Sequence, residues 1–243
     1  MLQRVDPETI AFGKLTGDGA PTDFTALKLT PNQLKAYSDA KPGDALNLST
    51  EEVTGLNAVG KNATAVQDKV HELMLARYRA YRAKGLAGIA PYARQGSETD
   101  PADDLIKFNR TVRATKVLPT EFYDLLDNYP KSTPSDLAEV FYWTQFRANG
   151  EDTIALVHTM QGTFEGTLVA VQRQYYVSTS YNAMQAIAGF LPTEGGTLVV
   201  YGNHTSTDQV AGFGGGAKRS IGRKIMASEL KKLFEKARVA VVQ

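Results

Sequence analysis

The segment from Glu139 to Asn203 constrains the fold more than any other part of this chain. It alternates stretches of aromatic and β-branched residues with short stretches of turn residues such as Asn149-Gly150. Aromatic and β-branched residues favour the pleated, half-buried surface of a strand, whereas glycine and asparagine favour tight turns. The pattern predicts consecutive antiparallel strands at 139–147, 153–161, 167–177 and 197–201.

Residues 181–191 fit two different structures. Their apolar residues recur at steps of three and four, as on one side of a helix. However, turn residues at 192–196 separate this segment from the predicted strand 197–201, and two strands joined in this way make a hairpin. We favour the strand over the helix here.

The C-terminal segment from Ala217 to Val242 is predicted to be one amphipathic helix. Such a helix needs an apolar partner surface, and the nearest one in the chain is the predicted sheet. The predicted fold class is therefore α+β: a curved antiparallel sheet over residues 139–203, packed against a long C-terminal helix and preceded by a helical region. The apolar stripe of this helix comprises Met226, Leu230, Leu233, Phe234, Ala237 and Val241.

The first half of the chain is predicted to be mainly helical. Thr30 is followed by Gln33, and Ser49 by Glu52, which is the capping-box pattern of a helix N-terminus. We expect one compact unit, with residues 1–60 as a small α/β subdomain and 61–243 as the main domain. The other predicted elements are short strands at 9–15 and 22–29, a loop at 85–96, and helices at 62–84, 100–116 and 119–128.

Charge is distributed unevenly, although the net charge of the 243 residues is only +1. Residues 217–243 contain eight lysines and arginines against two glutamates, so this segment carries +6. Its basic face is a candidate for peripheral contact with a membrane surface or for contact with an acidic partner.

The basic and aromatic run from Arg77 to Lys84 resembles a nucleic-acid contact. Cations at a helix C-terminus and tyrosines at a core margin explain it instead, so we expect no nucleic-acid partner.

The chain contains no cysteine, which excludes disulfides and thiolate chemistry. No apolar run approaches the roughly 18 residues of a membrane span, and the first residues show no leader. We expect a periplasmic or secreted location if a leader has been removed, and a cytoplasmic one otherwise.

Several short sequence segments, spread over most of the chain, carry a resemblance to a known family. They are Asp23-Phe24-Thr25-Ala26-Leu27, Lys41-Pro42-Gly43-Asp44, Phe141-Tyr142-Trp143, Ile154 to Thr159, Gln174 to Ser178, and Val200 to Asn203 before a glycine-rich loop. These segments are similar to those of an uncharacterised family of bacterial proteins, many of them exported. The resemblance implies export and brings no known activity. Family members carry cysteines around the Pro-Gly-Asp segment and a histidine after Tyr-x-Ser, whereas this chain has Ala40, Ala45 and Thr179 there. That departure removes any disulfide and weakens a catalytic role for Thr179.

The histidines show no metal-ligand spacing. His158 alternates with apolar residues, so we expect a hydrogen-bonded core histidine, with a ligand-binding or catalytic role as the alternative. His204 lies in polar sequence and is expected to be solvated. Ser178 or Ser180, His158 and Asp208 could in principle form a Ser/His/Asp catalytic triad. The chain contains no Gly-x-Ser-x-Gly nucleophile-elbow motif that would support it.

The glycine-rich loop at 212–216 is not a Walker A motif, because Lys218 lies between alanine and arginine. The loop nevertheless precedes a predicted helix N-terminus, whose free N–H groups lie beside Lys218 and Arg219. A site for an anionic headgroup or phosphate is therefore the alternative to a plain surface turn.

Together these patterns predict a non-enzymatic domain that binds an apolar or amphipathic, lipid-like ligand between the sheet and the C-terminal helix. The arrangement resembles the helix-grip fold of START-related lipid-binding domains, an analogy of fold that does not by itself give function. A hydrolase or an envelope interaction module is the alternative, and no catalytic residue, metal ligand or cofactor is predicted. The predicted ligand-binding residues are His158, Arg173, Tyr175, Tyr201, Gly214, Lys218 and Arg219.

Overall fold

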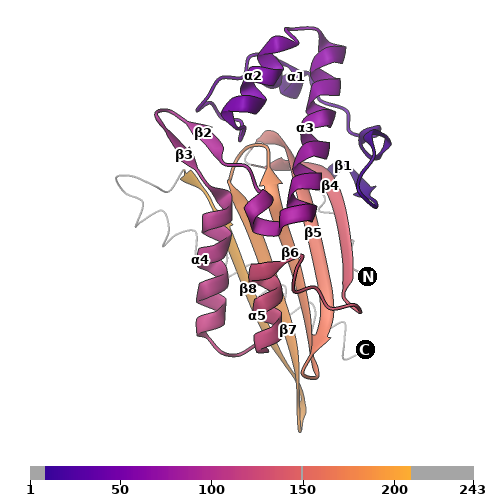
Figure 1. Ribbon diagram of the computed structural model, residues 1–243, viewed down its shortest axis with the longest axis vertical. Helices are drawn as coiled ribbons and strands as arrows, with labels where there is room; N and C mark the ends of the chain where they lie inside the picture. The colour runs from indigo at the N-terminus through magenta and orange to yellow at the C-terminus, as the bar shows by residue number, and fades with distance from the viewer. Residues whose placement is uncertain (1–8, 149, 209–243) are drawn as a thin grey trace. The chain divides into compact units, whose positions relative to one another are not determined.

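A computed structural model describes residues 9–148 and 150–208 of the chain (Figure 1). In this part the protein is α+β, with a six-stranded antiparallel sheet, a two-stranded hairpin and five α-helices. The fold described below is that of the compact unit ending at Ser206. None of the helices in the described ranges has the length and apolar content that crossing a membrane requires.

The large sheet has the strand order β1-β4-β5-β6-β7-β8, so every strand after β1 neighbours the next one in sequence. The strand prediction for residues 181–191 is confirmed, because β7 and β8 form a hairpin closed at Thr193 and Gly196. The predicted strand at 9–15 is confirmed as β1. The six strands are β1 (Thr9–Leu15), β4 (Ala138–Ala148), β5 (Glu151–Phe164), β6 (Thr167–Val177), β7 (Ala183–Thr193) and β8 (Gly196–Ser206).

Both predicted capping boxes are formed, with Thr30 paired to Gln33 and Ser49 to Glu52. Two local predictions are wrong: residues 22–29 form no strand, and the predicted loop at 85–96 contains regular structure. The helices are α1 (Pro31–Ser38), α2 (Thr50–Ala58), α3 (Ala63–Lys84), α4 (Pro101–Ala114) and α5 (Thr120–Asn128), with short 3-10 helices η1 (Pro21–Phe24) and η2 (Gly85–Gly88). The small hairpin consists of β2 (Tyr92–Arg94) and β3 (Ser97–Thr99).

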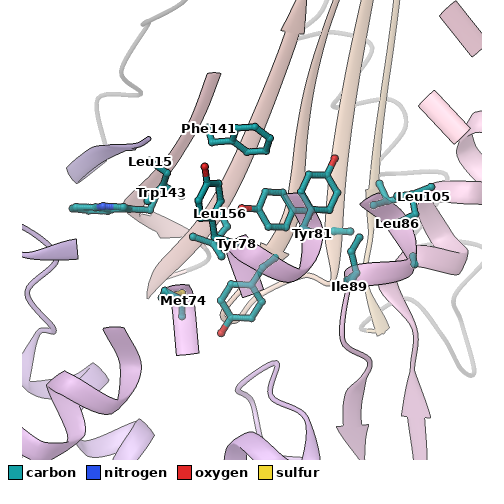
Figure 2. Packing of buried hydrophobic residues seen from close by; sticks show 14 of the residues in the cluster. Leu15, Met74, Tyr78, Tyr81, Leu86, Ile89, Leu105, Phe141, Trp143 and Leu156 are labelled. Atoms are coloured by element: carbon teal, nitrogen blue, oxygen red, sulfur yellow. The ribbon is translucent and has the colours of Figure 1, made fainter. Parts of the chain in front are cut away.

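The predicted helix-grip arrangement is wrong. The longest helix in the described ranges is α3, with 22 residues, and it lies in the middle of the chain rather than at the C-terminus. Its last turns place Tyr78 and Tyr81 edge-on against Phe141 of β4 (Figure 2). Proximity in sequence favours the C-terminal segment as the partner of the sheet, whereas a helix far upstream supplies these aromatic contacts. Residues 217–242 lie outside the described residues.

The sheet has two different faces, which we call inner and outer. Helix side chains pack on the inner face: Phe122 of α5 contacts Phe164, and Phe108 of α4 stacks on His204. The main core lies between these helices and this face. On the inner face the Trp143 indole lies across Gly13 and donates to the Asp23 carbonyl at 2.8 Å.

A β-bulge changes the alternation at the end of β6. Leu156 pairs with Tyr176 and Val157 with Gln174, so Tyr175 is an extra residue in β6. As a result Tyr175 and Tyr176 both belong to the inner core, while Val177 packs on the outer face. Strict alternation predicts that Tyr175 and Val177 share a face, and the inserted residue makes that prediction wrong.

Candidate functional site

Two of the predicted ligand-binding residues, His158 and Arg173, lie opposite each other on β5 and β6. Both side chains are fully buried. The hydroxyl of Tyr81, from α3, lies between them, 3.2 Å from His158 Nδ1, and it accepts a hydrogen bond from Arg173 Nη1 at 3.1 Å. The two residues are therefore linked through a side chain of α3.

The protonation of this group follows from its surroundings. Burial lowers the pKa of His158 to about 4, so its ring is neutral at pH 7. Its Nε2 lies 3.1 Å from Glu139 Oε2, and this hydrogen bond lowers the pKa of the Glu139 carboxyl. His158 Nε2–H thus donates to the carboxylate, and Nδ1 accepts from the Tyr81 hydroxyl. Both ring nitrogens of His158 therefore have a partner.

The series continues on the other side of Arg173. Arg173 Nε donates to Gln185 at 2.5 Å, and Gln185 donates in turn to Asn109 of α4 at 2.8 Å. Asn109 donates to Asp127 of α5 at 2.9 Å. The buried polar chain, as we call it, comprises Glu139, His158, Tyr81, Arg173, Gln185, Asn109 and Asp127.

The guanidinium of Arg173 is buried without a carboxylate beside it. Among the described residues, none of the ion pairs includes it. Its partners are neutral oxygens: the Tyr81 hydroxyl, the Gln185 amide and, at 3.0 Å, the Leu126 carbonyl. Burying a charge costs free energy unless hydrogen bonds compensate it, so these contacts are needed for the folded state.

Aromatic rings frame the buried polar chain. Tyr175 stacks on Tyr81 with ring centroids 3.9 Å apart, and Phe141 stacks on His158 at 4.0 Å. The Tyr175 hydroxyl is buried and, among the described residues, meets no hydrogen-bond partner. Tyr175, a predicted ligand-binding residue, thus contributes its ring to the core while its hydroxyl stays outside the chain of hydrogen bonds.

The hydroxyl cluster after β6 is not joined to His158. Ser178 Oγ accepts from the Ile154 amide at 2.8 Å, and Ser180 Oγ donates to the Ala148 carbonyl at 3.2 Å. Both ring nitrogens of His158 are engaged by Tyr81 and Glu139. The geometry therefore gives no support to the Ser/His hydrolase alternative.

Of the remaining predicted residues, Tyr201 is the one that the structure describes. Tyr201 is on β8, where it pairs with Ala188 on the outer face, so the sheet separates it from His158 and Arg173. Gly214, Lys218 and Arg219 lie outside the described residues. His204, expected to be solvated, is part of β8, and its ring stacks on Phe108 at 5.1 Å.

Sequence reasoning missed five members of the buried polar chain, namely Tyr81, Glu139, Gln185, Asn109 and Asp127. One signal was present for Gln185, which alternates with Ala183 and Ile187 on the buried side of its strand. A polar residue at such a position requires a partner, but the alternation does not identify that partner.

The outer face carries a second apolar cluster. Its centre is formed by the fully buried Ala155, Val157 and Val177. Three partly buried aromatic residues surround them, and this outer cluster comprises Ala155, Val157, Val177, Tyr142, Phe146 and Tyr181. Its members come from strands and from the β6–β7 connection, and none comes from a described helix.

Polar groups and exposed apolar side chains border the outer cluster. The Tyr142 hydroxyl accepts from Gln172 at 2.7 Å, and the Tyr181 hydroxyl donates to Gln174 at 2.5 Å. Phe12 and Val140 are each 44% exposed on the same face. The face therefore combines apolar area with phenol and amide groups.

Comparison of the chain with protein-family models, with curated proteins and with solved structures gave no match. Within residues 9–148 and 150–208, no three His, Asp or Glu side chains are arranged to hold a metal ion. The resemblance to an exported bacterial family thus remains an expectation from sequence.

Proposed function

We propose that this protein is a non-enzymatic binding domain that takes an apolar or amphipathic molecule on the outer face of its sheet. The observation that supports the proposal is the outer cluster, a group of apolar and aromatic side chains with a buried centre and a partly exposed aromatic rim, to which no described helix contributes. The inner face is a poorer candidate, because helices cover it and the buried polar chain uses the polar groups there.

The chemistry of the outer face suits an amphipathic ligand. Covering a half-exposed side chain such as Phe12 or Val140 contributes about 1 kcal/mol, at about 25 cal/mol per Å² of apolar surface. The Tyr142–Gln172 and Tyr181–Gln174 pairs offer hydrogen bonds to a polar head without carrying charge. A neutral or weakly polar headgroup is therefore favoured over a strongly anionic one.

Two measurements test the proposal. The first is mass spectrometry of an organic-solvent extract of the purified protein, in which we expect a co-purifying amphiphile. The second is a titration with the apolar dye N-phenyl-1-naphthylamine, whose affinity should fall at least fivefold in the Phe12→Ser/Val140→Ser double variant.

Leu198→Ser is the matched control for the dye titration. Leu198 is 53% exposed but belongs to the inner side of the β7–β8 hairpin, opposite Leu191. It should leave dye binding unchanged. Absence of any bound amphiphile together with equal dye binding by all three proteins would exclude the outer face as the site.

A further inference from the structure

Tyr81 is a fully buried phenol with a base on one side and a cation on the other. Its hydroxyl lies 3.2 Å from His158 Nδ1 and accepts a hydrogen bond from Arg173 at 3.1 Å. The His158 ring is neutral, because burial lowers its pKa to about 4, so Nδ1 is free to take up a proton. Tyr78 and Tyr92 are different, since their hydroxyls donate to backbone carbonyls, which are not proton acceptors in this sense.

A route for the Tyr81 proton leads from the core to the protein surface. His158 Nε2–H donates to Glu139 Oε2 at 3.1 Å, and the Glu139 side chain is 33% exposed. When Tyr81 gives its proton to Nδ1 and Nε2 gives its own to Glu139, the imidazole becomes the other neutral tautomer. The ring then carries no positive charge opposite the buried Arg173 guanidinium, and Glu139 can release the proton to water.

The Tyr81 ring also belongs to a stack of aromatic rings that leads to the same carboxylate. It lies nearly parallel to the Tyr175 ring, with centroids 3.9 Å apart and an interplanar angle of 6°. Tyr129 stacks on it as well, at 5.7 Å, and hydrogen-bonds to Glu139 through its hydroxyl. Aromatic rings at such separations are coupled electronically, so an electron can leave Tyr81 through the stack.

We propose that Tyr81 is a redox-active tyrosine, which loses one electron and one proton together and becomes a neutral tyrosyl radical. The electron reduces a one-electron oxidant outside the chain, of the class of radicals derived from peroxides. The Tyr81 O–H bond breaks as the His158 Nδ1–H bond forms. The His158 Nε2–H bond breaks in turn as an O–H bond forms on Glu139.

The surroundings of Tyr81 favour this coupled loss over loss of the electron alone. Removing only the electron would leave a cation next to the buried Arg173, and an uncompensated charge in the core is costly. After the coupled step the Tyr81 oxygen is neutral and can accept from both Arg173 and His158 Nδ1–H. Burial then separates the radical from solvent, so we expect it to outlive radicals on exposed tyrosines. The inference does not depend on the proposed function, because the outer cluster contains none of these residues.

The test is flash photolysis of the full-length protein with tris(bipyridine)ruthenium(II) and persulfate, which together generate a one-electron oxidant in solution. We expect a long-lived tyrosyl radical, seen by its absorption and its electron paramagnetic resonance signal, that is lost in Tyr81→Phe. His158→Gln retains a hydrogen-bond acceptor but no base, so this radical should form about a hundredfold more slowly. Replacing H₂O by D₂O should slow its formation in the unchanged protein, because a proton moves with the electron.

Tyr175→Phe is the matched control. The Tyr175 ring is equally buried and stacks on Tyr81, but its hydroxyl has no hydrogen-bond partner in the described ranges. This variant should keep the long-lived radical, and circular dichroism should show all variants folded. The D₂O measurement uses the unchanged protein and therefore decides the question even where a variant does not fold. The proposal would be overturned by the absence of a long-lived radical, by its persistence in Tyr81→Phe, or by formation rates that neither His158→Gln nor D₂O changes.

Discussion

Replacing Tyr81 by phenylalanine removes one oxygen from the middle of the buried polar chain. That oxygen accepts from Arg173 and lies within hydrogen-bond distance of His158 Nδ1. The ring itself remains, so the stack on Tyr175 and the contact with Phe141 are preserved. The variant therefore isolates the hydroxyl from the packing.

The magnitude follows from the two partners left behind. A buried neutral group without its hydrogen bond costs about 1–3 kcal/mol, and a charged one more. Both His158 and Arg173 are fully buried, so water cannot replace the lost oxygen. We expect Tyr81→Phe to lower the free energy of unfolding by about 3–5 kcal/mol. A domain of ordinary stability survives such a loss and remains measurable.

Urea unfolding followed by circular dichroism measures this change, and Tyr175→Phe is the control. Tyr175 is equally buried and stacks on the Tyr81 ring, but its hydroxyl has no hydrogen-bond partner within residues 9–148 and 150–208. Its removal should change the free energy of unfolding by less than about 1 kcal/mol, or increase it. Equal losses in the two variants would refute the view that the buried polar chain, rather than ring packing, requires the Tyr81 hydroxyl.

Two further predictions concern pH and backbone conformation. Burial lowers the pKa of His158 from its ordinary value of 6.5 to about 4 on folding. The unfolded chain therefore binds more protons between these values, and stability should fall as pH decreases from 6.5 to 4. The free energy of unfolding, measured in urea titrations, should fall by about 3 kcal/mol over this range. The lowered pKa of Glu139 acts in the same direction. If a His158→Gln variant showed the same dependence of stability on pH, this explanation would be contradicted. Gly85→Ala should cost more than about 3 kcal/mol, because φ is +59° and a Cβ would lie 1.9 Å from the Tyr129 carbonyl oxygen. Gly60→Ala, with φ of +67° and open space, should cost only about 1 kcal/mol, and similar thermal-melt shifts for both would disprove the steric argument.

Local chemistry explains why much of the secondary structure could be predicted. The capping boxes at Thr30 and Ser49 act within three residues, and the structure forms both. Strand-forming residues separated by turn residues likewise specify hairpins between neighbours, which is the connectivity of β4 to β8. These signals need no information from distant parts of the chain.

The covering helix could not be chosen in the same way. Both α3 and the C-terminal segment have an apolar stripe, and a stripe shows that a helix needs a partner without showing which one. Proximity in sequence favours the C-terminal segment, yet the contacts of Tyr81 with Arg173 join residues 92 positions apart. Apolar patterning alone cannot rank such pairings.

The sequence by itself determined the strands, most helix boundaries and the expectation that His158 is buried and hydrogen-bonded. Only the tertiary structure decided which groups satisfy it, because Tyr81 and Glu139 reach the ring from separate elements. The tertiary structure also decided which face each tyrosine occupies, since one inserted residue at Tyr175 reverses the alternation beyond it. The physical reason is the same in both cases: burial is encoded locally, whereas the partner of a buried group is set by packing between distant segments.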